Sequence, residues 1–128
     1  MKAIKKIKKQ FQDKIDELKN KLLVDAGFDN LSKDVQGFVT DTVVGRAYFR
    51  TQFFTVPLWA LKDRRVGYFI YYVAHELAHI VRDFYCDTNG HHDSEFYFYF
   101  KMICPKEYQH HELKYKPTSA KYGIRKNK

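Results

Sequence analysis

The sequence predicts an α+β fold, and three segments with different spacing of apolar residues support this. A stripe at intervals of three and four near the N-terminus is typical of a helix. A segment rich in Val, Thr, Phe and Tyr over residues 37–56 is typical of strands, and helical spacing returns from about residue 65. The 128 residues, 45% of them apolar, are enough for one compact core. We therefore expect a single domain over residues 1–128, with a basic N-terminal helix over 1–25, a core over 37–104 and an irregular basic tail over 105–128.

The N-terminal segment carries the first apolar stripe. Its members are Ile4, Ile7, Phe11, Ile15, Leu18 and Leu22. They share one face of an amphipathic helix, which we expect to pack onto the body of the domain. Ala26-Gly27 and the polar residues that follow should end this helix, because glycine suits a C-terminal cap.

The β-rich segment predicts a small sheet. We expect two strands, at about 37–44 and 47–56, with a turn at Gly45 and an end at Pro57. From about Arg65 to Arg82 the apolar spacing predicts a helix. After a polar connection over 83–92, Asp93 or Ser94 is an expected N-cap for a further helix that runs to about Ile103.

The first of these two helices contains the motif His-Glu-x-x-His, formed by His75, Glu76 and His79. A helix turns by about 100° per residue, so both histidines project from one face, about 6 Å apart along the axis. Both imidazoles can therefore reach one zinc ion. Glu76 lies at the edge of that face, where its carboxylate can act as general base on a zinc-bound water. The motif predicts one catalytic Zn²⁺ and peptide hydrolysis.

A catalytic zinc needs a third protein ligand and one open position. The metzincin pattern is excluded, because its third ligand would fall at Tyr85 and Arg82 stands where that pattern has glycine. The candidates instead precede or begin the next helix. His92 is our first choice, His91 is the second, and Glu95 is the third, as a glutamate on the next helix would resemble the thermolysin arrangement.

A second polar cluster follows near the C-terminus. It comprises Tyr108, Gln109, His110, His111 and Glu112. Either histidine, or Tyr115, is a candidate donor to the oxyanion that forms during peptide hydrolysis. The default interpretation of this cluster is a solvated loop.

From about Phe53 to Phe100 the chain resembles the SprT-like metallopeptidases and the small phage and bacterial metallopeptidases related to them. The resemblance is carried by Phe54-Thr55-Val56-Pro57-Leu58-Trp59, by the helix with Tyr71-Tyr72-Val73-Ala74-His75-Glu76-Leu77-Ala78-His79, and by a glycine and histidine pair before Asp93-Ser94-Glu95-Phe96. It implies a minimal zincin-like fold in which the strand before the active helix borders the cleft.

In such families the third ligand is a histidine four residues before an aromatic residue on the next helix, as His92 is before Phe96. Asp93 stands where a small residue is usual, so His91 stays an alternative. The resemblance also implies that a substrate peptide adds in extended form to residues 50–56. SprT-like proteins often carry a zinc ribbon, and this sequence has none, with only Cys86 and Cys104.

Charge and hydropathy suggest the surroundings of the protein. The net charge is +8, with lysines concentrated at the two ends, which favours a nucleic-acid partner or a solubilising surface. No segment has the apolar length of a signal peptide or a membrane span. We expect no membrane partner, a cytoplasmic location (the host cytoplasm if the gene is from a phage) and two free thiols.

Two functions from different classes fit these observations. The first is a zinc metallopeptidase that hydrolyses a protein or peptide substrate through water activated by Glu76, either broadly or on one regulatory partner, as repressor-cleaving metallopeptidases of mobile genetic elements do. The alternative is a basic nucleic-acid-binding module with a structural or vestigial zinc site. The sequence predicts neither the substrate nor the oligomeric state.

Overall fold

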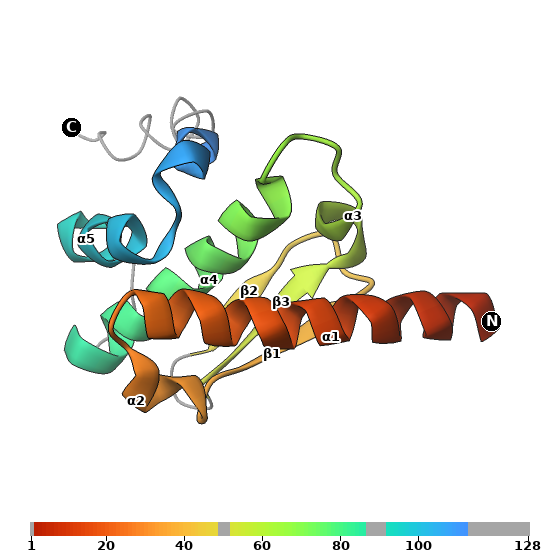
Figure 1. Cartoon of the computed structure of the whole chain (residues 1–128), viewed down its shortest axis with the longest axis horizontal. Coiled ribbons are helices and arrows are strands. Elements are labelled where there is room, and N and C mark those ends of the chain that lie inside the picture. Colours follow the sequence, from red (N-terminus) through yellow and green to blue (C-terminus); the bar gives the residue numbers. More distant parts are fainter. Residues whose placement is uncertain (1, 49–51, 87–91, 113–128) are drawn as a thin grey trace.

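The computed structural model of the chain describes residues 2–48, 52–86 and 92–112 (Figure 1). Its elements in chain order are α1 (Lys2–Asp25), α2 (Asp29–Ser32), β1 (Gln36–Thr40), β2 (Arg46–Tyr48), β3 (Phe53–Pro57), α3 (Leu58–Leu61), α4 (Tyr68–Cys86), α5 (Ser94–Ile103) and the 3-10 turn η1 (Lys106–Tyr108). The predicted α+β class is confirmed. No helix in these ranges is long and apolar enough to cross a membrane.

The sheet differs from the expected pair of strands. Residues 47–56 contribute to two strands rather than one, and Gln52, with a φ of 55°, lies in the turn just before β3. The strand order is β1-β3-β2, with β1 parallel and β2 antiparallel to β3. β3 is therefore the central strand, and Phe53, Phe54 and Thr55 are paired on both sides. The expectation that a substrate peptide adds to residues 50–56 is wrong for Phe53, Phe54 and Thr55, because each of them pairs with both β1 and β2.

One face of the sheet packs against helices. α1 contacts β1, α4 contacts β2 and β3, and the two helices also contact each other, as the crossing ribbons in Figure 1 show. Phe54 and Val56 of β3 point into this layer and are fully buried beside Ile15 of α1. Gly37 is required here, because a side chain at this position would overlap the ring of Phe54 and the methyl group of Ile15.

The free edge of β1 is covered by a side chain from α1. Gln12 Nε2 donates a hydrogen bond to the carbonyl oxygen of Gly37 at 2.6 Å, and Gln12 Oε1 accepts one from the backbone N–H of Val39 at 3.3 Å. A glutamine amide presents a donor and an acceptor, as a neighbouring strand would. Among the described strands, this leaves β2 as the edge without such a cover.

The helices end and begin close to where the sequence predicts. α1 ends at Asp25 and Gly27 follows with a φ of +91°, as expected for a glycine after a helix. α4 starts three residues later than predicted and continues to Cys86. α5 starts at Ser94 with Asp93 as its N-cap, whose side chain accepts a hydrogen bond from the N–H of Phe96. Cys86 and Cys104 are free thiols, as predicted.

Candidate metal centre

α4 supplies two histidines and a glutamate to one region of the structure. This helix is buried over most of its length because it lies between the sheet and α5. His75 and His79 occupy successive turns of α4. Both residues are partly buried, and the centroids of their rings lie 5.0 Å apart. Glu76 is 6% exposed. The apolar stripe that buries α4 thus also fixes the direction in which the two histidines point.

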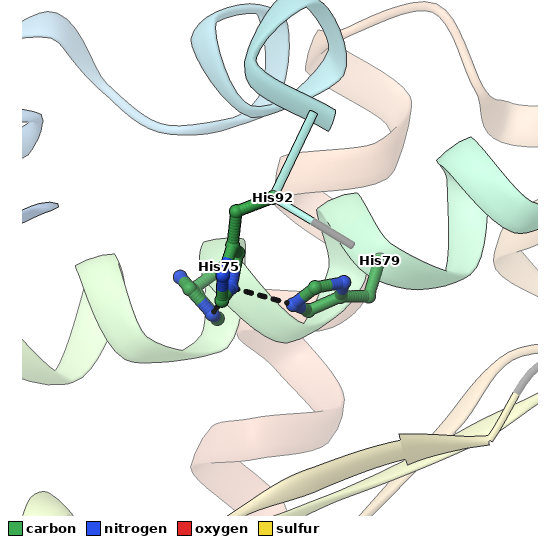
Figure 2. A group of neighbouring side chains, drawn as sticks. All are labelled: His75, His79 and His92. Carbon is green, nitrogen blue, oxygen red and sulfur yellow. Dashed lines mark hydrogen bonds between the residues drawn. The ribbon is translucent and has the colours of Figure 1, made fainter. Parts of the chain in front are cut away.

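His92, which lies two residues before α5, completes a cluster with these two histidines (Figure 2). Its Nε2 atom lies 3.1 Å from Nε2 of His79 and 3.2 Å from Nε2 of His75. One ligand atom from each of the three residues lies within 4.8 Å of the others. We call His75, His79 and His92 the histidine cluster.

The position of His92 is fixed by an ion pair between α4 and the start of α5. Arg82 Nη2 donates to Asp93 Oδ2 at 2.6 Å, and Arg82 Nε donates to Asp93 Oδ1 at 3.3 Å. The same Oδ1 atom accepts the capping hydrogen bond of α5. Arg82, which the metzincin pattern lacks, therefore holds the residue next to His92 by a bidentate contact.

Phe96 forms the apolar wall of the cluster. Its ring is fully buried, and its centroid lies 4.4 Å from that of His79, 4.8 Å from that of His92 and 5.1 Å from that of His75. A single aromatic ring thus packs against all three imidazoles. Such contacts restrict the side-chain rotamers of the three histidines, which is a requirement for a site that could hold a metal.

Hydrogen bonding within the cluster cannot satisfy all three Nε2 atoms in their neutral forms. His75 Nδ1 faces the carboxylate of Glu112 at 2.8 Å and carries the proton, which leaves a lone pair on its Nε2. If the Nε2–H group of His92 donates to that lone pair, the Nε2 atom of His92 has no free lone pair with which to accept a hydrogen bond from His79. A cation at the centre satisfies three lone pairs at once. Nitrogen ligands at zinc distance in a tetrahedral site lie roughly 3.3 to 3.4 Å apart, close to the observed contacts.

Glu112 supports the histidine cluster through a contact with His75. Its Oε1 atom receives hydrogen bonds from His75 Nδ1 and from the hydroxyl of Tyr71, both at 2.8 Å, and all three side chains are largely buried. Burial alone would lower the pKa of His75, but the hydrogen bond and charge of Glu112, with the charge of Glu76, raise it. Burial would raise the pKa of Glu112, but His75 and Tyr71 lower it. A carboxylate on the second nitrogen of a histidine is the usual support of a metal ligand.

The electrostatic environment of the motif suits neutral ligands and a proton acceptor. Burial, together with the neighbouring histidines, lowers the pKa of His79 to about 2, so its imidazole is neutral. Burial also raises the pKa of the Glu76 carboxyl to about 7, assisted by Glu112 and opposed by His75. A carboxylate with a pKa near neutrality is well matched to general acid–base work at physiological pH.

The remaining sequence candidates that the structure describes are not part of the histidine cluster. Glu95 is exposed, accepts a hydrogen bond from Ser94 and is not part of the histidine cluster. His91 and Tyr115 fall outside the described residues. His110 is exposed, and one ring nitrogen of each of His110 and His111 lies at hydrogen-bonding distance from a backbone carbonyl. His111 is buried beside the ring of Tyr71, so the predicted solvated loop is wrong for His111 and Glu112.

In the sequence, Glu112 is recognisable only as a member of a polar cluster, and its contact with His75 is not predicted. The signal was weak, because a glutamate in a polar segment is ordinarily a surface residue. Comparison with known proteins adds nothing further: no family model matches the chain, and searches of the curated proteins and of the solved structures found no match.

Proposed function

We propose that the chain is a zinc-dependent metallopeptidase with His75, His79 and His92 as ligands and Glu76 as general base. The observation that carries the proposal is the convergence of three Nε2 atoms beside a buried glutamate of raised pKa. Three histidine ligands would leave room for a water molecule on the metal, as in catalytic sites and unlike structural sites.

Each residue of the site has a distinct part in peptide hydrolysis. When bound, zinc would act as a Lewis acid and would lower the pKa of a bound water molecule to about 7. Glu76 accepts a proton from the attacking water and returns it to the amine that leaves. Glu112 holds the His75 imidazole in the tautomer that presents its Nε2 lone pair. Phe96 excludes water from one side of the cluster.

A minimal zincin-like fold of the SprT-like kind is part of the proposal. It is supported by the order of a strand, the His-Glu-x-x-His helix and a second helix preceded by His92. The small size of the sheet, with only three strands in the described ranges, fits a minimal member of that group.

The test combines zinc content with cleavage of a peptide library derived from a proteome. Wild type should hold one zinc per chain by elemental analysis and should produce new peptide N-termini. Glu76→Gln should retain the zinc and lose cleavage, whereas His75→Ala and His92→Ala should lose both. His110→Ala is the control, since this exposed histidine is not part of the cluster. Wild type without zinc, or cleavage by Glu76→Gln at the wild-type rate, would exclude the proposal.

A further inference from the structure

One side of α5 presents apolar side chains to solvent rather than to the fold. Phe96 and Phe100 face α4, and the ring of each lies near that of His75. Phe98, between them in the sequence, points away from α4 and is 60% exposed, and Met102, one turn later, is 44% exposed. Because α5 lies at one end of the molecule, this outer side is accessible (Figure 1).

The apolar side of α5 continues onto the end of α4. The Phe98 ring packs edge to face against Tyr99, with 5.1 Å between the centroids, and Tyr99 stacks on Tyr85 of α4 at 5.9 Å. Tyr85 is 48% exposed, and Phe84, whose ring contacts it, is 38% exposed. We call Phe84, Tyr85, Phe98, Tyr99 and Met102 the aromatic patch.

The aromatic patch has the size of the apolar centre of a dimer interface. Taking about 200 Å² for a fully exposed side chain of this kind, its four most exposed members leave roughly 350 Å² open to solvent. A stable interface buries about 800 Å² on each partner, and somewhat more than half of that area is apolar. The aromatic patch would therefore supply most of the apolar area that each copy needs.

Two charges on the same side of α5 make this surface complementary to itself. Glu95 and Lys101 are exposed and lie three residues before and three residues after Phe98. A step of three residues turns a helix by about 300°, so both charges stay within about 60° of the direction of Phe98. Within the described part of the chain, neither of them forms an ion pair.

Opposite charges at equal distances from Phe98 favour one particular partner, which is a second copy in the antiparallel direction. When two α5 helices pack antiparallel with Phe98 against Phe98, Glu95 of each copy lies at the level of Lys101 of the other, and both pairs attract. A parallel pair would instead bring Glu95 against Glu95 and Lys101 against Lys101, which repel. A partner of different sequence gives no reason for this symmetric arrangement of charges.

We propose that the protein forms a homodimer through the aromatic patch, with the two α5 helices antiparallel about a two-fold axis at Phe98. Phe98 packs at the centre, and the two pairs of Glu95 and Lys101 lie at the polar rim. The interface is on the side of α5 opposite the histidine cluster, because Phe98 and Phe96 are about 200° apart around the helix. Dimerisation therefore does not depend on the proposed peptidase activity.

The test measures the mass of the full chain by sedimentation equilibrium across micromolar concentrations, where wild type should form dimers. Phe98→Asp should raise the dimer dissociation constant at least about thirtyfold, because it places two like charges at the centre of the interface. Glu95→Lys and Lys101→Glu should each raise it at least about fivefold, since like charges then face each other. The double variant with both changes exchanges the charges and should return to within about threefold of wild type.

The charge exchange separates the loss of an interface from the loss of folding. Lysine at the start of α5 and glutamate at its end both oppose the helix dipole, so the double variant cannot regain the dimer through greater stability. Phe38→Ser is the aromatic control, because it removes a ring that is 42% exposed on β1, and it should dimerise like wild type. Wild type that stays monomeric, dimers of Phe98→Asp as tight as those of wild type, or a double variant no tighter than its two parents would overturn the proposal.

Discussion

Glu112 Oε1 lies 2.8 Å from Nδ1 of His75, although the two residues are 37 positions apart in the sequence. The contact joins the C-terminal segment to the middle of α4 within the core. A proton on Nδ1 of His75 follows from it, and this proton determines which ring nitrogen is open to a metal. The segment after α5 therefore belongs to the site.

Replacing Glu112 should weaken zinc binding. Glu112→Ala leaves the Nδ1–H of His75 and the hydroxyl of Tyr71 without their buried acceptor, and we expect about 10- to 100-fold lower zinc affinity. Competition against a chromophoric chelator measures this. Glu112→Gln keeps an oxygen acceptor and should lose less, and the exposed Glu107→Ala should match wild type. Unchanged affinity in Glu112→Ala would show that the contact does not support the site.

Asp93 should matter for stability and for the hold on zinc. Asp93→Ala removes the N-cap of α5, which is worth about 1 kcal/mol, and also the partner of the buried Arg82. Asp93→Asn retains a capping oxygen, so its free energy of unfolding in urea should lie between those of wild type and alanine. Zinc release should be faster in Asp93→Ala, because His92 adjoins the lost contacts. Equal stability of the two variants would contradict this role of the cap.

The two thiols should react at very different rates in the folded protein. Burial raises the pKa of the Cys104 thiol to about 12, whereas Cys86 is partly exposed. Only the thiolate reacts, so at pH 8 roughly one Cys104 in ten thousand is in the reactive form. A thiol reagent such as dithionitrobenzoate should modify one thiol per chain quickly and the second only after denaturation. Cys86→Ser should abolish the fast phase, and a fast phase that survives would contradict the burial of Cys104.

A methyl group at Gly37 should destabilise the fold. It would overlap the ring of Phe54 and the side chain of Ile15, so Gly37→Ala should cost about 1–3 kcal/mol in urea unfolding. Gln36→Ala is the matched control, because this neighbouring side chain is exposed and does not face the core. If both variants unfold at the same urea concentration as wild type, the packing of α1 against β1 is looser than the structure shows.

Local features of the sequence predicted the two helices that build the candidate site. The apolar spacing around Val73 and Leu77 predicted a buried helix with His75 and His79 on one face, and Asp93 predicted the start of the next helix. Both signals lie within a few residues of the structure that they describe, because helix hydrogen bonds and caps are local.

Contacts between distant segments could not be predicted in the same way. The central position of β3 depends on which strands pair with it, and the residue types at Phe53, Phe54 and Thr55 do not indicate that both edges of the strand are occupied there. The contact of Glu112 with His75 has the same character, since it depends on the path of the chain after α5. The single long strand expected over 47–56 failed because a turn at Gln52 interrupts an otherwise β-rich run.

The amide of Gln12 on the edge of β1 limits how copies of this molecule can associate through their sheets. Each copy has one strand edge of the described sheet capped in this way and one, at β2, without such a cap. Two copies that joined edge to edge through β2 would consume both uncapped edges, and the joint sheet would end at a capped strand on either side. Edge-to-edge addition of further copies would stop at this pair. The side chain of Gln12 therefore prevents assembly of the protein into an open-ended fibre through its sheets.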